Sequence, residues 1–227
     1  LQVYCLGSVC TAPEFRGKGY ASRILEQIYA FIKQTGASLL LVSGGGSLYT
    51  RFGCVNFGVI KRYTITATDA EIFHRINSDS PIRFRLYEAK DIFQLHCLSM
   101  QSKARYEESL NEKAQLIESE AFASIFNLNH KVYVAELDGK LIASVIVAAQ
   151  VNHADEEPFI VEWNGVANVA VSLISYAMQQ LSLQKIYLNS PWQESDMHEA
   201  LKAISFTQID NLGTIRIMDF QKLWDQI

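Results

Sequence analysis

The feature that most constrains the fold of this chain is an order of elements that occurs twice. Residues 1–68 are predicted to form a strand, a long helix, a buried strand, a short helix and a strand pair, and the residues after 158 repeat that order. The repeat has a period of about 150 residues and rests on the pattern of apolar and polar positions, not on residue identity. We therefore expect two related units, each alternating strands with helices.

The second copy is preceded by elements that the first copy lacks. They are a strand, two helices and a hairpin, predicted at 82–87, 89–103, 111–126 and 131–149. If the copies are equivalent, the first has lost its front half, and the start at Leu1 without an initiator Met agrees with the cut edge of a longer protein. A truncated first unit would expose a sheet edge, which is a route to homo-oligomers.

A polar segment containing NSDSP separates the two copies. We predict an incomplete first domain at 1–70, a linker at 71–81 and a complete second domain at 82–227. Each domain is expected to be a mixed, mostly antiparallel sheet flanked by helices, so the predicted fold class is α/β in element order and α+β in sheet type.

Composition limits the partners of the chain. The net charge of −4 lacks the excess of cations that broad nucleic-acid binding requires. No apolar run approaches the ~20 residues of a membrane span, so no membrane partner is expected. The four cysteines form no CxxC pair, which favours reduced thiols in a cytoplasmic protein, and the five histidines show no ligand-like spacing, so no metal is expected.

The stretch EFRGKGYAS, residues 14–22, places two glycines and two cations at the predicted start of a helix. The first turn of a helix exposes unpaired N–H groups and the positive end of the helix dipole. Gly17 and Gly19 would allow close approach to that backbone, and Arg16 and Lys18 add charge. This combination predicts a phosphate-binding site.

The same stretch resembles a motif of a known enzyme family. VCTAPEFRGKGYAS, residues 9–22, is similar to the acetyl-CoA-binding motif of the GNAT superfamily of N-acetyltransferases, Gln/Arg-x-x-Gly-x-Gly/Ala, with Arg16, Gly19 and Ala21 at its three defined positions. LYTRFGC, residues 48–54, resembles the Tyr-x-x-x-Gly-Phe segment of the family, with Cys54 where Phe is usual. The order of elements also resembles tandem GNAT proteins of the Eis-like type, although more weakly.

The resemblance implies an acetyl-CoA site and a direct-transfer reaction. Backbone amides of Arg16, Gly17, Lys18, Gly19, Tyr20, Ala21 and Ser22 would hold the pyrophosphate. Backbone near Val9 and Thr11, on a strand that splays from its neighbour, would pair with the pantetheine amides and polarise the thioester carbonyl.

Tyr49 is the implied general acid, which would protonate the departing thiolate, although it could instead only pack against the cofactor. Arg51 is interpreted as a surface residue of that turn, and no residue is assigned as the general base. The acceptor is expected to be a small-molecule or peptide amine of unknown identity.

The second copy lacks these features. Its corresponding stretch, VEWNGVANVAV, contains Gly165 but no arginine or lysine, and no tyrosine occupies the acid position. We interpret it as a degenerate, non-catalytic unit. Two alternatives to an acetyltransferase stay open: a non-catalytic acyl-CoA-binding sensor or interaction module, and a binding module for another phosphate ligand such as a nucleotide.

Overall fold

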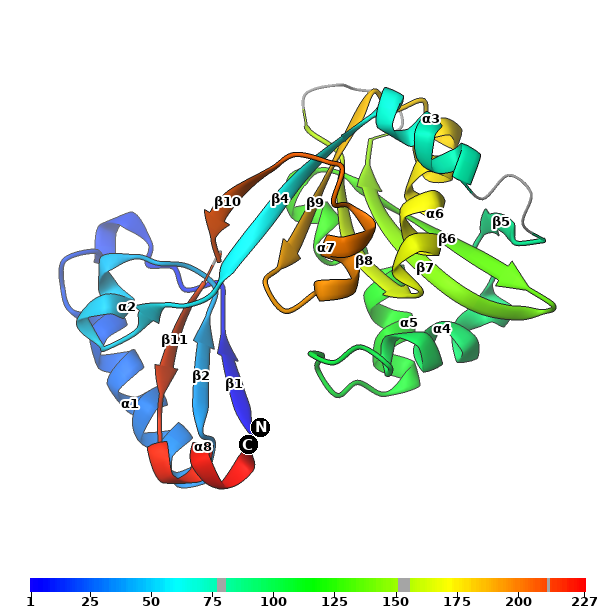
Figure 1. Cartoon of the computed structure of the whole chain (residues 1–227). Coiled ribbons are helices and arrows are strands. Elements are labelled where there is room, and N and C mark those ends of the chain that lie inside the picture. The colour runs from blue at the N-terminus through cyan, green and yellow to red at the C-terminus, as the bar shows by residue number, and fades with distance from the viewer. Residues whose placement is uncertain (77–80, 151–155, 212) are drawn as a thin grey trace. The chain divides into compact units, whose positions relative to one another are not determined.

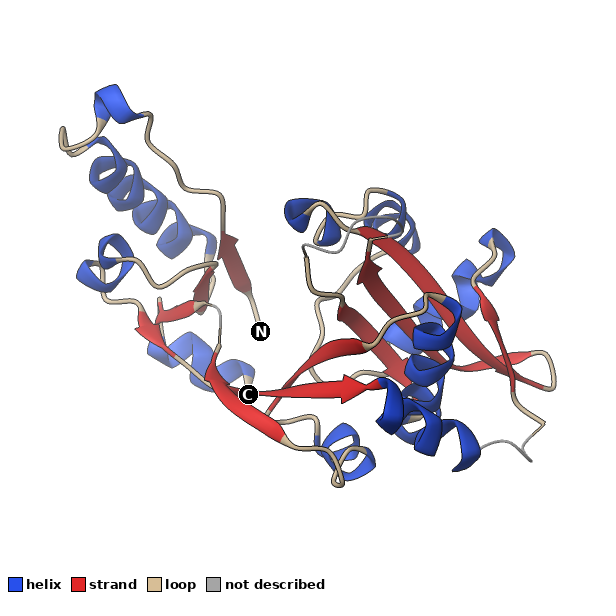
Figure 2. Ribbon diagram, turned by 90° about the horizontal axis from the view of Figure 1, so that it is seen from above, coloured by secondary structure: helices blue, strands red, loops and turns tan. Residues whose placement is uncertain are grey.

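The computed structural model describes residues 1–76, 81–150, 156–211 and 213–227, and divides the chain into two compact units. Unit 1 comprises Leu1–Ile60 together with Ile209–Ile227, and unit 2 comprises Lys61–Gln208. Both units contain mixed sheets flanked by helices, the fold class expected from the sequence (Figure 2). No helix in these described ranges is long and apolar enough to cross a membrane.

Unit 1 is built on a four-stranded sheet with the strand order β1-β2-β11-β3 (Figure 1). β1 and β2 are parallel, and β11 runs antiparallel to both of its neighbours. Its elements are β1 (Val3–Leu6), a short 3-10 turn (Pro13–Phe15), α1 (Tyr20–Thr35), β2 (Leu39–Val42), α2 (Ser47–Arg51), β3 (Val55–Asn56), β11 (Thr214–Ile217) and α8 (Phe220–Gln226).

The core of unit 1 lies between α1 and the sheet. Leu25, Tyr29 and Ile32 recur at helical spacing and are the buried residues of α1. They share a cluster with Leu40 and Val42 of β2. Gly36 ends α1 in the left-handed conformation, with φ 84°, which is a common end for a helix.

Unit 2 is built on a seven-stranded sheet with the strand order β10-β4-β9-β8-β7-β6-β5. The strands are β4 (Val59–Thr66), β5 (Arg83–Leu86), β6 (Asn129–Leu137), β7 (Lys140–Ala149), β8 (Phe159–Gly165), β9 (Lys185–Pro191) and β10 (Phe206–Asp210). The helices are α3 (Ala67–Ile76), α4 (Ile92–Ser99), α5 (Leu110–Glu118), α6 (Ala167–Gln180) and α7 (Ser195–Ala200), with 3-10 turns at Ala89–Asp91 and Ala123–Phe126.

The predicted linker at 71–81 differs from the structure. Residues up to Ile76 continue α3, and Ala70 and Phe73, one helical turn apart, are buried in the main core of unit 2. The segment is polar apart from a few residues, so its composition did not indicate that Ala70 and Phe73 pack in the core. The remainder of the NSDSP stretch, residues 77–80, lies outside the described residues.

The last two strands also differ from the prediction of one strand pair. β10 pairs with β4 in the seven-stranded sheet, whereas β11 lies between β2 and β3 in the four-stranded sheet. The orders β1-β2-β11-β3 and β8-β9-β4-β10 are equivalent, so the two copies exchange their third strand. For this reason residues 209–227 belong to unit 1, although the sequence pattern predicted a second domain that continued to residue 227.

Candidate functional site

The segment between β1 and α1 forms a loop with two glycines in the left-handed region. Gly17 has φ 75° and Gly19 has φ 77°. Residues with a Cβ adopt such positive values only at an energetic cost. Gly19 is the N-cap of α1, and no side chain accepts a capping hydrogen bond from the first turn. Nε of Arg16 donates to the carbonyl oxygen of Thr11 at 3.0 Å, which ties the loop to itself. The start of α1 therefore keeps amide groups for an anion.

A pocket of about 270 Å³ lies at this helix start, and we call it the α1 pocket. Seven residues that the sequence predicted to bind the cofactor line it: Thr11, Arg16, Gly17, Gly19, Tyr20, Ala21 and Ser22. Lys18 is not among its lining residues, and its Nζ lies 5.1 Å from the centre of the Phe15 ring. The structure thus brings most of the predicted loop into one concave site.

A second pocket of about 400 Å³ adjoins the first and shares Thr11, Phe15, Tyr20 and Ala21 with it. Its other lining residues are mostly apolar and come from the loop and α1: Ser8, Val9, Cys10, Ala12, Ile24, Leu25 and Ile28. The pair of pockets therefore combines a cationic end with an apolar end, which suits a ligand that carries both phosphate and hydrocarbon.

Val9 and Thr11 lie outside the strand on which the sequence analysis placed them. β1 ends at Leu6 and pairs with β2 over its whole length, from Val3 to Leu6. Val9 and Thr11 belong to the irregular backbone that follows, and both line the apolar pocket. Splaying of the two strands is therefore absent over residues 3–6.

Tyr49, the predicted acid, lies in α2 and packs against the core cluster of unit 1 together with Leu48 and Phe52. A Cβ added at Gly44 would lie 3.7 Å from Cε2 of Tyr49, so the ring sits against the glycine loop that precedes α2. Tyr49 is not among the residues that line either pocket. Its role as an acid stays a prediction.

Arg51 is the functional candidate that the sequence analysis missed. Together with Leu48, one helical turn earlier, it lines the α1 pocket from α2. Its Nε donates to the carbonyl oxygen of Ser47 at 3.2 Å, which holds the side chain along α2. The i, i+3 spacing of Leu48 and Arg51 was the available signal, but it does not say what α2 faces.

The charges of the site favour an anion. Two guanidinium groups, Arg16 and Arg51, line the α1 pocket, and no carboxylate is among the described residues that line either pocket. Within the described ranges, no group of three His, Cys, Asp or Glu side chains could hold a metal ion. The site can bind phosphate oxygens, but the structure supplies no general base to its lining.

No comparable loop joins β8 to α6 in the described part of unit 2. A single residue, Val166, connects the end of β8 to the start of α6. Gly165, the last residue of β8, has φ 87°. A Cβ at Gly165 would overlap the carbonyl of Ile142 and lie 2.9 Å from Cα of Ala143, so strand packing requires this glycine. The glycine at this position is therefore explained by the packing of β8 against β7.

The counterpart of the α1 pocket in unit 2 carries the opposite charge. A pocket of about 650 Å³ at the start of α6 is lined by Asp196 and Glu199 and by no arginine or lysine. Met197, the third residue of α7, occupies the place that Tyr49 has in α2, and it is fully buried. Glu199 occupies the place of Arg51. Unit 2 is therefore unsuited to bind phosphate at this position.

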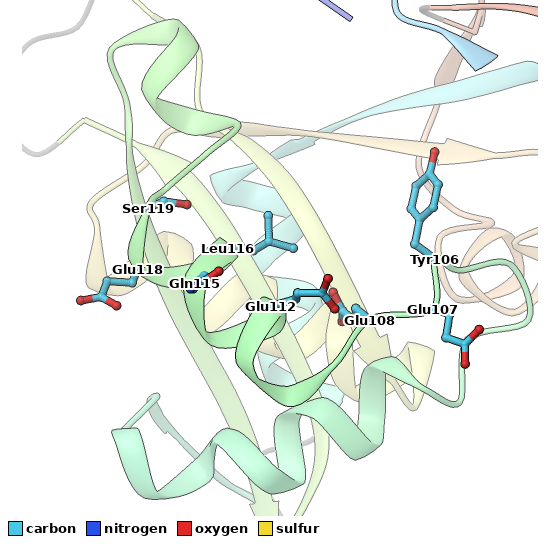
Figure 3. A pocket seen from close by; sticks show the side chains of 8 residues that line it. All are labelled: Tyr106, Glu107, Glu108, Glu112, Gln115, Leu116, Glu118 and Ser119. Atoms are coloured by element: carbon cyan, nitrogen blue, oxygen red, sulfur yellow. The ribbon is translucent and has the colours of Figure 1, made fainter. Parts of the chain in front are cut away.

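A larger open pocket of about 730 Å³ in unit 2 is lined by four glutamates, Glu107, Glu108, Glu112 and Glu118. Figure 3 shows that they do not converge, because Glu107 and Glu118 lie at opposite ends of the pocket. Glu112 caps α5 through Ser109, and Glu108 contacts the buried Lys113 at 3.3 Å. Glu112 therefore stabilises the start of α5, and Glu108 interacts with a buried lysine of that helix.

Comparison with known proteins identifies a related family model for part of unit 1. The family model of the FR47-like protein matches residues 1–52, which contain β1, the loop, α1 and α2. No curated protein sequence matches the chain at a significant level.

Three solved structures have the same fold. The GCN5-related N-acetyltransferase from Anabaena variabilis aligns with 15% identity and a TM-score of 0.68, over 96% of this chain and 56% of that one. A conserved protein of unknown function from Enterococcus faecalis, a probable N-acyltransferase, gives 16% and 0.70, over 98% and 58%. Eis1 from Mycobacterium abscessus gives 14% and 0.57, over 93% and 55%. The chain has the GNAT fold and spans about half the length of these structures.

Proposed function

We propose that the chain is a GNAT-superfamily protein whose unit 1 binds acetyl-CoA at the start of α1 and transfers the acetyl group to a primary amine. The observation that carries the proposal is the α1 pocket, where an uncapped helix start, two left-handed glycines and two arginines converge. The GNAT fold and the FR47-like match over residues 1–52 support it independently of the pocket.

The residues present fit the proposed donor. First-turn amides at Tyr20, Ala21 and Ser22 would donate hydrogen bonds to the phosphate oxygens, while Arg16 and Arg51 would neutralise their charge. The adjoining apolar pocket would take the hydrocarbon part of the pantetheine arm. Acetyl-CoA, when bound, supplies an acetyl group activated as a thioester.

The remaining chemistry is assigned to the residues of unit 1. Backbone amides near Val9 would stabilise negative charge on the carbonyl oxygen during transfer. Tyr49 would donate its phenolic proton to the departing sulfur, and the accepting amine would have to lose a proton to water or to a base outside the pockets described above.

Calorimetric titration with acetyl-CoA tests the binding half of this proposal. We expect Gly19→Glu to abolish binding, because it adds a carboxylate and a Cβ at the phosphate site. Gly139→Glu is the matched control, since Gly139 also has φ 77° and open space but lies in the β6–β7 turn of unit 2. Equal loss in both variants, or none in either, would contradict the proposed site.

One observation favours binding without catalysis as the second candidate. No carboxylate lines either pocket among the described residues, and Tyr49 packs in the core cluster instead of lining them. Turnover measured with a panel of amines separates the two candidates. Tight acetyl-CoA binding with no thiol release for any amine would favour a sensor or interaction module, whereas turnover that falls in Tyr49→Phe would favour the enzyme.

We also propose that the two units form a tandem, Eis-like pair in which only the first is active. The support is the equivalent strand order of the two sheets, combined with the absence of a loop and of cations at the start of α6. Acetyl-CoA should accordingly bind with a stoichiometry of one per chain in the same titration.

A further inference from the structure

β8 and β9 separate along their length in unit 2. They are parallel and pair only at Phe159 with Tyr187 and at Ile160 with Leu188. Both strands continue beyond these pairs, β8 to Gly165 and β9 to Pro191. The carboxyl ends of the two strands therefore diverge, and an opening at that end of a sheet is a common place for a ligand.

A pocket of about 170 Å³ lies at this opening, and we call it the β8–β9 pocket. Trp163 and Gly165 of β8 line it together with residues that follow β9 and α4: Gln193, Glu194, Ser195, Asp196, Gln101, Ser102 and Lys103. Its volume of about 170 Å³ is below the usual range for drug-sized ligands, so it suits a small ligand such as an amino acid.

Glu194 contributes a partly buried carboxylate to this pocket. Its carboxylate has no hydrogen bond or ion pair to any described residue, although the side chain is partly buried. Burial raises the pKa of Glu194 above its usual value, and the nearby Asp196 adds to the effect, while Lys103 opposes it. A partly desolvated carboxylate without a partner is stabilised by any cation that enters the pocket.

Lys103 supplies a complementary charge. It lines the same pocket, and among the described residues it forms no ion pair with Glu194 or Asp196 within 4.0 Å. Opposite charges that share a pocket without contact suit a ligand that carries both charges itself. Trp163 adds an aromatic wall for an apolar side chain.

We propose that the β8–β9 pocket binds a small ligand with a primary ammonium group and a carboxylate, an amino acid in chemical class. Glu194 and Asp196 take the ammonium group, Lys103 takes the carboxylate, and Trp163 contacts the side chain. The proposal concerns unit 2 alone and does not depend on acetyl-CoA binding in unit 1.

The experiment follows the indole N–H signal of Trp163 by nuclear magnetic resonance in the full chain without CoA. The signal is assigned through Trp163→Phe, and Trp224 of α8 in unit 1 serves as an internal reference. The probes are L-leucine, N-acetyl-L-leucine, which lacks the ammonium group, and 3-methylbutylamine, which lacks the carboxylate. This method detects millimolar affinities, and the dispersion of the indole signals reports folding of each variant.

L-leucine should shift the Trp163 signal with saturation and leave Trp224 unchanged. N-acetyl-L-leucine should cause no shift, and 3-methylbutylamine should bind several-fold more weakly. Glu194→Gln should weaken leucine binding about tenfold, the loss expected for one charge-assisted contact, while Glu118→Gln, a control in a different pocket, should not.

Three outcomes would overturn the proposal: no saturable shift with leucine, equal binding of leucine and its N-acetyl derivative, or unchanged binding in a folded Glu194→Gln variant. Equal binding of leucine and 3-methylbutylamine would overturn the role of Lys103. None of these results affects the acetyl-CoA site, which is tested by a separate titration in unit 1.

Discussion

The phenol oxygen of Tyr29 lies 3.7 Å from Sγ of Cys54 in the core of unit 1. Cys54 stands where the GNAT segment usually has Phe, and the structure places it against the ring of a residue from α1. The guanidinium of Arg216 lies over the ring of Tyr29, 4.6 Å from the ring centre. Burial together with the contact to Cys54 raises the pKa of Tyr29 to about 12, against an opposing effect of Arg216.

This contact predicts a loss of stability at alkaline pH. Unfolding returns the pKa of Tyr29 to about 10, so the unfolded chain loses this proton first as pH rises. The stabilisation is complete below about pH 10 and is lost as the pH approaches 12. Between about pH 9 and pH 11 we expect wild type to lose about 1.4 kcal/mol more than Tyr29→Phe.

Urea unfolding of both proteins at the two pH values measures this difference. The Phe variant is the control for the other groups that titrate in the same range and do not contact Tyr29, because their surroundings are the same in both proteins. Identical pH dependence of the two unfolding free energies would contradict the assigned cause.

Arg51 should matter for donor affinity although the sequence analysis placed it on the surface. It lines the α1 pocket from α2, as Arg16 does from the loop. We expect Arg51→Gln and Arg16→Gln each to weaken acetyl-CoA binding about tenfold, as loss of one charge-assisted contact to phosphate predicts. Lys33→Gln, which removes an exposed cation from the last turn of α1, should leave the affinity unchanged.

Calorimetry at two salt concentrations checks the cause. Binding to wild type should weaken with salt, and each arginine variant should show a smaller salt dependence. An Arg51→Gln variant with wild-type affinity and salt dependence would remove Arg51 from the site while leaving the loop itself in place.

Local signals were sufficient to predict the loop and its helix. Gly19 and Gly36 flank α1, and apolar residues recur at helical spacing between them, so neighbours in sequence determine the helix. Of that apolar set Leu25 and Ile32 are buried, whereas Ile24 and Phe31 are exposed. The fold class could be predicted for the same reason, because each strand and helix has its own pattern.

Contacts between segments that lie far apart in the sequence could not be predicted in this way. β10 and β11 look like a hairpin in sequence, but β11 pairs with β2 and β3 of the first copy, and nothing within residues 206–217 encodes that choice. The direction of Arg51 depends on where α2 packs. The unpartnered Glu194 also depends on the divergence of β8 and β9, which is a property of two separate segments.

A buried ion pair in unit 2 should be costly to break. Nζ of Lys113, on α5, donates to both carboxylate oxygens of Glu162, on β8, at 2.6 and 2.8 Å. Lys113 is 2% exposed, so Glu162→Gln would leave a buried cation with only Glu108 as an anionic partner among the described residues. We expect a loss of about 2–3 kcal/mol in the free energy of unfolding, measured by chemical denaturation.

The double variant Lys113→Met with Glu162→Gln separates charge burial from packing. Removing the cation as well should recover most of the loss. Glu199→Gln, which breaks an exposed pair with Lys202, should leave the free energy of unfolding nearly unchanged. If the buried and exposed variants cost the same, Lys113 is solvated and the pair is not a determinant of stability.

Alanine substitutions at Gly165 and Gly139 test why the second copy has a glycine at the end of β8. Both have positive φ, 87° and 77°, so alanine is strained at either position. At Gly139 a Cβ would meet nothing within 4 Å, and we expect Gly139→Ala to cost about 1 kcal/mol. At Gly165 the Cβ would overlap the Ile142 carbonyl, which also accepts a hydrogen bond from N of Val166 at 3.0 Å.

Gly165→Ala must therefore displace β8 from β7 as well as strain the backbone, and we expect a loss of more than about 3 kcal/mol. Chemical denaturation of the two alanine variants measures the difference. A similar small cost for both would mean that β7 and β8 adjust freely at this point, and the glycine would then need an explanation other than strand packing.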